Sequence, residues 1–296
     1  MAGSMKGKVC IVTGANTGIG AETALGLAKL GGTVVMVCRD RDKGEEARAN
    51  IVKRSGNAAV SLMIADLSSQ NQIRRLAADF LGGRSGAPSL VDGRPRLDVL
   101  LHNAAAILPH RRVSVDGLEM QFAVNHLAPF LLTHLLLDVL KSSAPSRVVV
   151  VASQVESRGT LRWDDLQMEK GYTPLEAYFQ SKLANVLFTY ELARRLEGTG
   201  VTANCLHPGV ISTNLLSDYM GRPRSMGFLN SLTNPGPEKG AKPSIRLASD
   251  PALATTTGKY FKEMVETKSS RASYDMEAAR RLWDLSAQLT SSTSPG

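Results

Sequence analysis

The sequence is poor in cysteine, with three residues in 296, and each of them lies in an apolar run (Cys10, Cys38 and Cys205). An odd number in a chain of this length argues against a disulfide framework, so we expect three buried thiols and a cytoplasmic protein. Long apolar stretches are missing too: Val148–Ala152 is far too short to cross a bilayer, and no signal-peptide pattern opens the chain. These absences predict no integral membrane segment.

Aromatic residues make up only 5% of the chain, although its net charge is +8. Lysine and arginine are spread along the sequence, whereas nucleic-acid binding needs a clustered basic stripe or a known module. We therefore expect no nucleic-acid partner. The positive charge indicates either a basic soluble surface or attraction for an anionic cofactor.

Metal-ligand spacing is also missing. The five histidines have no H-x-x-x-H or C-x-x-C partner, so the sequence predicts no metal site. We expect His102 to be packed in the interior rather than catalytic.

The chain does contain a regular alternation of strand and helix patterns. The run 34–37, Val-Val-Met-Val, is typical of a strand buried on both faces of a parallel sheet. Repeated βα units predict an α/β fold, a single doubly wound Rossmann-type domain with a parallel sheet flanked by helices. Ligands in such sheets bind at the carboxyl ends of the strands. The expected strands are 9–13, 33–38, 59–65, 97–101, 147–152 and 201–206, and the expected helices are 17–30, 41–54, 69–81, 115–141 and 174–196.

A glycine-rich turn, T-G-A-N-T-G-I-G, joins the first expected strand to the first expected helix. Such a turn lets backbone N–H groups approach a phosphate closely. Gly14 can supply the tight bend, Gly18 leaves room for a cofactor, and Gly20 allows close packing of the helix on the strand. The spacing is G-x-x-x-G-x-G rather than the commoner G-x-G-x-x-G.

A second motif, Tyr178-Phe-Gln-Ser-Lys182, lies in the expected helix 174–196, with Ser153 upstream of it. Residues four apart share one face of a helix. A free tyrosine has a pKa near ~10, and a neighbouring ammonium favours the phenolate. We therefore expect Lys182 to lower the pKa of Tyr178 and make it a usable acid or base.

Together these residues resemble the short-chain dehydrogenase/reductase family, over nearly the whole chain from about Lys6 to about Leu289. The glycine turn, Ser153, the Y-x-x-x-K motif and Pro208-Gly209 all follow the family's order. Within the family the chain is similar to the retinol dehydrogenase branch. The segments that carry this second likeness are 125–133, 181–189, 207–209 and 279–284, together with the long interval between Ser153 and Tyr178.

The resemblance implies roles for four catalytic residues. Ser153 would hydrogen-bond the substrate oxygen, Tyr178 would exchange a proton with it, and Lys182 would hold the nicotinamide ribose. Asn125 would hold a water that links Lys182 to solvent, or its amide would cap a helix kink. The cofactor-binding residues that the resemblance implies are Gly14, Asn16, Thr17, Gly18, Ile19, Gly20, Arg39, Asp66, Leu67, Asn103, Ala104, Tyr178, Lys182, Pro208, Gly209, Ile211 and Thr213.

The end of the second expected strand indicates which cofactor is bound. A carboxylate there would bond the ribose hydroxyls and select NAD, but this chain has Cys38 followed by Arg39. A guanidinium binds phosphate bidentately, so the pair favours NADP(H). Arg39 as a solvated residue and Asp40 as a ribose ligand stay open as alternatives. Asp66 would lie near the adenine, cap the next helix, or do both.

We therefore predict an NADP(H)-dependent oxidoreductase that moves a hydride between nicotinamide and an alcohol or carbonyl group. The expected substrate is small and apolar (a retinoid, steroid, lipid aldehyde or similar), with reduction favoured. Two alternatives remain, a tailoring ketoreductase of a biosynthetic pathway and a non-catalytic NADP(H)-sensing interaction protein. Whether the chain forms a homo-oligomer is left open.

The expected domain covers residues 6–289. Residues 1–5 read as an expression remnant or disordered start, and 290–296 as a disordered tail. A Gly/Pro-rich stretch at 82–95 is expected as a surface loop. Residues 212–237 are expected to form the substrate loop, because the family places that loop after the last strand-end turn.

Overall fold

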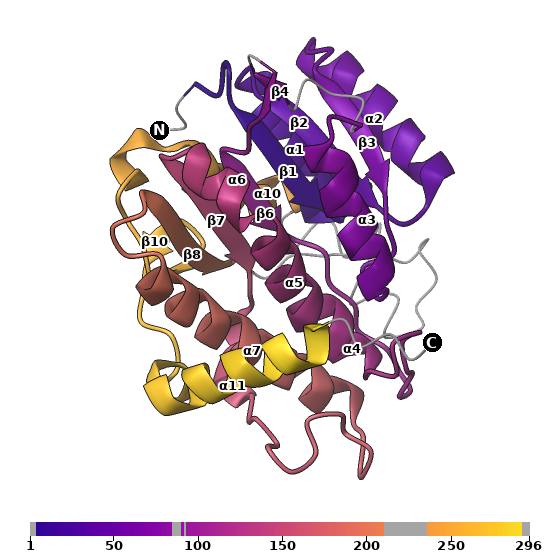
Figure 1. Ribbon diagram of the computed structural model, residues 1–296, viewed down its shortest axis with the longest axis vertical. Helices are drawn as coiled ribbons and strands as arrows, with labels where there is room; N and C mark the ends of the chain where they lie inside the picture. The colour runs from indigo at the N-terminus through magenta and orange to yellow at the C-terminus, as the bar shows by residue number, and fades with distance from the viewer. Residues whose placement is uncertain (1–3, 85–89, 92, 210–235, 292–296) are drawn as a thin grey trace.

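The computed structural model describes residues 4–84, 90–91, 93–209 and 236–291. It has an eight-stranded sheet in the order β10-β9-β8-β7-β6-β1-β2-β3 (Figure 1). All neighbouring strands are parallel except β10, which runs antiparallel to β9. The predicted α/β, doubly wound parallel fold is confirmed. The strands are β1 Val9–Thr13, β2 Thr33–Cys38, β3 Val60–Ile64, β6 Val99–His102, β7 Ser146–Val151, β8 Val201–His207, β9 Lys259–Lys262 and β10 Val265–Glu266.

Helices cover both faces of the sheet, and each face has its own apolar core. In β1, Val9 and Ile11 pack in one cluster while Cys10 and Val12 pack in the other, as the alternation of side chains along a strand requires. One layer contains α1 (Gly18–Lys29), α2 (Arg41–Ser55) and α10 (Pro237–Ser249). The other contains α3 (Gln70–Leu81), α5 (Ala128–Leu135), α6 (Leu137–Ser142), α7 (Pro174–Arg195) and α11 (Met276–Thr290).

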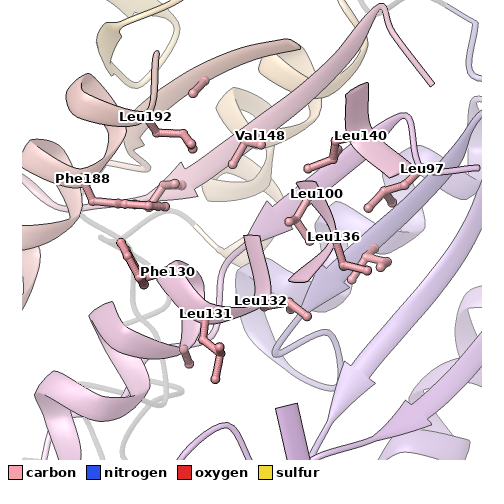
Figure 2. Close-up of a cluster of buried hydrophobic side chains, with 14 of the residues drawn as sticks. Leu97, Leu100, Phe130, Leu131, Leu132, Leu136, Leu140, Val148, Phe188 and Leu192 are labelled. Atoms are coloured by element: carbon pink, nitrogen blue, oxygen red, sulfur yellow. The ribbon is translucent and has the colours of Figure 1, made fainter. Parts of the chain in front are cut away.

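The larger core joins α5, α6 and α7 to β6 and β7. Figure 2 shows Phe130 and Phe188 approaching one another between helices α5 and α7, with their ring centroids 5.8 Å apart. Leu100 and Val148 extend from the sheet into the same cluster. Burial of this kind contributes roughly 25 cal/mol per Å² of apolar surface, so the cluster holds the helices firmly against the strands.

The strand order changes direction between β1 and β6. The chain builds β1, β2 and β3 outward on one side and then returns to place β6 on the other side of β1. Ligands bind at such a switch point in open α/β sheets, outside the carboxyl ends of the strands. The glycine turn follows β1 and therefore lies at this point.

The expected helix 115–141 is wrong as a single element. A short turn, closed by a bridge between Val113 and Glu119, occupies its start, and Gly117 within it has a φ of +78°. The Glu119 carboxylate accepts the N–H groups of Gln121 and Phe122, so helix begins only there. The remainder divides into α4 (Met120–Phe122), the π-helix η1 (Ala123–Leu127), α5 and α6.

Several elements are additional to those expected from sequence. They are β9, β10, α10, α11, the hairpin of β4 (Leu90–Val91) and β5 (Arg94–Pro95), and the 3₁₀ turns η2 (Gln154–Arg158), η4 (Pro251–Leu253) and η5 (Arg271–Tyr274). The hairpin falls within the expected loop 82–95, part of which lies outside the described residues.

The described domain is wider than expected at both ends. Met5 is buried, and its N–H donates to the Leu30 carbonyl. At the other end, α11 continues through Thr290, which is also buried. The expected substrate loop lies outside the described residues, apart from Gly236 and Pro237, where α10 begins. Within the described part of the chain, no helix has the length and apolar character that crossing a membrane requires.

Candidate active site

The carboxyl ends of β1, β2, β3, β6, β7 and β8 meet at one cavity of about 810 Å³, a volume typical of small-molecule and cofactor sites. Asn125 does not line it, and Ile211 and Thr213 lie outside the described residues. The predicted site residues that do line it are Gly14, Asn16, Thr17, Gly18, Ile19, Gly20, Arg39, Asp66, Leu67, Asn103, Ala104, Ser153, Tyr178, Lys182, Pro208 and Gly209.

The glycine turn has the backbone that its sequence predicts. Gly14 and Gly18 have φ values of +66° and +57°, which side chains other than glycine rarely adopt. A Cβ on Gly18 would meet nothing within 4 Å, whereas one on Gly20 would lie 2.2 Å from the Gly14 carbonyl oxygen. The α1 N-cap, Thr17, makes no side-chain bond to the helix. The first N–H groups of α1 are therefore open toward an anion.

Thr13, the first residue of the glycine-turn motif, joins the two strands of the switch point. Its Oγ1 accepts the N–H groups of Asn103 at 3.0 Å and Ala104 at 3.1 Å. In return, the Asn103 side chain donates to the carbonyls of Thr13 at 3.0 Å and Gly14 at 3.3 Å. This reciprocal set fixes the backbone of Asn103 and Ala104 beside the glycine turn.

Charged residues gather where β2 ends and α2 begins. Asp40 is the N-cap of α2: its Oδ1 accepts the Lys43 N–H, and its Oδ2 lies 3.1 Å from the Lys43 ammonium. That N–H bond holds the pKa of the Asp40 carboxyl below its ordinary value. Arg39 is exposed, lines the cavity and makes no ion pair with any residue of the described ranges. Arg39 is therefore available to an anionic ligand, while both oxygens of Asp40 are occupied.

Asp66 does not cap the helix that follows it, so that part of the prediction is wrong. Its Oδ1 accepts the N–H and the hydroxyl of Ser68, at 2.9 and 2.8 Å. The cap of α3 is Ser69, whose hydroxyl accepts the Gln72 N–H. Asp66 instead stabilises the turn that places its own carboxylate at the cavity.

Tyr178 and Lys182 lie one turn apart on α7 and both line the cavity. The Lys182 ammonium lies 5.5 Å from the Tyr178 ring centroid and donates to the Val151 carbonyl at 2.9 Å. Burial lowers the pKa of Lys182 to about 8 and raises the pKa of Tyr178 to about 12. The expected lowering of the Tyr178 pKa by Lys182 is not found in this structure, where burial raises that pKa instead.

Ser153 follows β7 and caps the turn η2 at the cavity wall. Its carbonyl accepts the N–H of Glu156, whose side chain is buried. The Glu156 carboxylate in turn accepts the N–H and the hydroxyl of Ser270. A segment far along the chain thus supports the turn that carries Ser153.

Asn125 lies inside the π-helix η1 and is completely buried. Its amide accepts the Ala106 N–H at 2.7 Å and donates to the Ala106 carbonyl and the Ser181 hydroxyl, both at 2.9 Å. These bonds go to the loop after β6 and to α7 rather than to the backbone of η1, so they do not match the alternative of an amide that caps a helix kink, and the water-holding role stays a prediction. Through them, Asn125 ties the loop after β6 to the helix that carries Tyr178.

The interior position expected for His102 is confirmed. Its Nε2 lies 2.8 Å from the Thr133 hydroxyl, and burial lowers its pKa to about 3. His207 is also buried, and together with Pro208 and Gly209 it forms the cavity wall at the end of β8.

Sequence reasoning missed several lining residues. The position of Lys43 could have been predicted, because a lysine three residues after a helix N-cap faces the capping side chain. Other missed residues have no local signature, since the fold alone brings them to the cavity; they include Ser68, Leu108, Arg112, Val113, Val115, Met120 and Val124. Many of them are apolar.

Comparison with known proteins agrees with the geometry of the site. The family model for short chain dehydrogenase matches residues 8–221. The chain is 43% identical to human Retinol dehydrogenase 14, covering 96% of this chain and 86% of that protein, and 42% identical to human Retinol dehydrogenase 13, covering 99% and 87%.

Solved structures of similar proteins share the fold of this chain. A crystal structure of an uncharacterized protein from Mycobacterium Paratuberculosis superposes with a TM-score of 0.77 at 33% identity, covering 98% of this chain and 95% of that one. The Pseudomonas aeruginosa RhlG/NADP active-site complex superposes with a TM-score of 0.67 at 26% identity, covering 88% and 95%.

Proposed function

The chain belongs to the short-chain dehydrogenase/reductase family, in its retinol dehydrogenase branch, and on that premise we propose an NADP(H)-dependent oxidoreductase acting on apolar alcohols or carbonyl compounds. Membership of the family makes the chain an oxidoreductase. What we propose in addition is the preference for NADP(H), the class of substrate and reduction as the favoured direction. One observation carries it most: Ser153, Tyr178 and Lys182 line the same cavity as the glycine turn and Arg39.

The residues present fit a dinucleotide. The open space beside Gly18 and the uncapped start of α1 form a cradle that a Cβ at position 18 would narrow. Asn103 and Ala104 would hold the nicotinamide half, while Asp66 and Leu67 would hold the adenine. When bound, the cofactor supplies or accepts the hydride.

Arg39 would select the phosphorylated cofactor. Arg39 is exposed and lines the cavity where β2 ends. A guanidinium can form two parallel hydrogen bonds to a phosphate group. The acidic residue that would favour NAD is replaced by Cys38, whose thiol donates to the Asp40 carbonyl. An NADP complex is among the similar structures, and this supports the assignment.

Two side chains would contact the substrate oxygen. The Ser153 hydroxyl would donate a hydrogen bond to it and stabilise negative charge as it develops. Tyr178 would give it a proton during reduction or take one during oxidation. Because burial keeps the pKa of Tyr178 high, the phenol is protonated at neutral pH, as a donor in the reductive direction must be.

An apolar substrate is supported by the wall formed after β6. Leu108, Met120 and Val124 line the cavity there, and the Leu108 carbonyl accepts the hydroxyl of Tyr172, which lies shortly before α7. This contact places part of the apolar wall near the segment leading into the helix of Tyr178. Residues 212–237, of which the structure describes only Gly236 and Pro237, remain the proposed substrate loop.

The test is NADPH and NADH consumption with a panel of aldehydes and ketones that ranges from short polar compounds to retinoids, steroids and long-chain aldehydes. The proposal predicts turnover with NADPH and the apolar members, and little turnover with NADH. NADPH binding without turnover of any member would favour the sensing alternative. A preference for one elaborate biosynthetic ketone would favour the tailoring ketoreductase.

A further inference from the structure

The junction of β2 and α2 brings charges of both signs to the cavity. Arg39, Asp40 and Lys43 all line it there. A 2′-phosphate carries a charge of about −1.5 to −2, as other phosphate monoesters do, so a free carboxylate next to Arg39 would repel it. The same carboxylate would bond the ribose hydroxyls of a cofactor that lacks the phosphate. Asp40 alone would therefore act against the specificity that Arg39 favours.

In the structure both carboxylate oxygens of Asp40 have a partner on Lys43. Its Oδ1 accepts the backbone N–H of Lys43 at 3.1 Å, and its Oδ2 lies 3.1 Å from the Lys43 ammonium. The first bond belongs to the helix cap and would persist with any residue at position 43 except proline. The second contact depends on the Lys43 side chain, whose ammonium supplies a neutralising charge.

We propose that Lys43 determines cofactor specificity through Asp40. Its ammonium neutralises the Asp40 carboxylate and holds it against α2, so that a cofactor with a 2′-phosphate is accepted beside Arg39. This inference rests on the proposed NADP(H) preference and adds Lys43 to it as a positioning residue.

Removal of the Lys43 charge should therefore change specificity and not folding. The side chains of Lys43 and Asp40 are 64% and 42% exposed, and exposed ion pairs contribute little to stability. In Lys43→Met the bare carboxylate faces the phosphate, and Coulomb repulsion between exposed groups a few ångströms apart should weaken NADPH binding by roughly three- to tenfold. NADH binding should stay the same or strengthen.

The experiment measures the dissociation constants of NADPH and NADH at low ionic strength for the wild type, Lys43→Met, Asp40→Asn and the double variant. Asparagine caps helices as well as aspartate does, so the helix start is preserved. The double variant should return to within about twofold of wild-type NADPH affinity, because no bare carboxylate remains. Lys53→Met is the matched control: it removes the same charge at the other end of α2, about 15 Å away, and should leave both affinities unchanged.

Three results would overturn the inference while the NADP(H) preference stands. They are an unchanged NADPH/NADH ratio in Lys43→Met, an equal loss in Lys53→Met, and a double variant that stays as weak as Lys43→Met. The last result would mean that Lys43 contacts the phosphate directly. A wild-type protein that binds both cofactors equally would instead contradict the proposed cofactor preference, and the role of Lys43 with it.

Discussion

The Lys182 ammonium donates to the Val151 carbonyl at 2.9 Å, which fixes the α7 lysine to the end of β7. This bond crosses from the helix that carries Tyr178 to the strand that leads to Ser153. It orients a charge that the protein otherwise buries at a cost, since only 2% of Lys182 is exposed. Lysine here serves the site rather than the stability of the fold.

Replacement of Lys182 by methionine should stabilise the protein at neutral pH. Burial lowers the pKa of Lys182 from 10.5 to about 8, and this shift corresponds to about 3 kcal/mol of destabilisation while the group is charged in both states. Between pH 8 and 10.5 the unfolded chain binds more protons than the folded one, so wild-type stability rises with pH. Urea unfolding at pH 7 and pH 10 should show the advantage of Lys182→Met shrinking as the pH rises. An advantage of equal size at both values would mean that the lysine is not buried as a charge.

Gly18 and Gly56 form a matched pair for testing the cofactor cradle. Both have positive φ values, +57° and +69°, and a Cβ on either would meet nothing within 4 Å. Alanine at either position should therefore destabilise the fold by a similar amount, about 1–2 kcal/mol. Only Gly18 lines the cavity, so only Gly18→Ala should weaken NADPH binding, as measured by calorimetric titration. Equal binding by the two variants would place the dinucleotide elsewhere.

Arg39→Ala should weaken NADPH binding by roughly 2–3 kcal/mol, the range for a lost charge-assisted hydrogen bond, and should change NADH binding little. Arg41→Ala is the control, because Arg41 starts α2 and does not line the cavity. Fluorescence titration with both cofactors measures the difference. Equal losses for NADPH and NADH in Arg39→Ala would show that the arginine is structural.

Thr13→Val should destabilise the switch point. The substitution leaves the partly buried N–H groups of Asn103 and Ala104 without the hydroxyl that accepts their hydrogen bonds, and each unpaired donor costs up to about 1–3 kcal/mol. Thr13→Ser keeps the hydroxyl and should retain most of the stability. Thermal unfolding of the two variants separates the hydrogen bonds from the packing of the methyl group. Similar losses in both would assign the effect to packing.

The sequence was sufficient for the central strands because their apolar runs are continuous. Val34–Val37 is buried on both faces, and the expected ends of β1 and β2 match the structure. The strands at the β10 edge of the sheet were not predictable in this way, because their apolar runs are short. Strand β9 has four residues, and two of them, Tyr260 and Phe261, are buried. The region 115–141 has a helical composition throughout, yet the turn at Gly117 and the carboxylate of Glu119 divide it.

In the site, too, the residues of local motifs were predictable from the sequence, whereas the contacts between distant segments were not. Motifs local in sequence placed the glycine turn, Tyr178 and Lys182 at the cavity, as their residue types imply. Contacts between distant segments were not predictable, such as the bonds of Thr13 to residues 90 positions away. The Tyr178 pKa was mistaken because the extent of burial, which raises it, is a property of the folded chain and not of the motif.

The account depends most on Tyr178 as the group that exchanges a proton with the substrate oxygen. Tyr178→Phe removes one hydroxyl and keeps the ring, so the cavity and the position of Lys182 should be preserved. With the best carbonyl substrate of the panel, we expect the variant to bind NADPH almost as the wild type does and to lose turnover by several orders of magnitude. Near-normal turnover with intact NADPH binding would contradict the assignment and place the proton donor elsewhere.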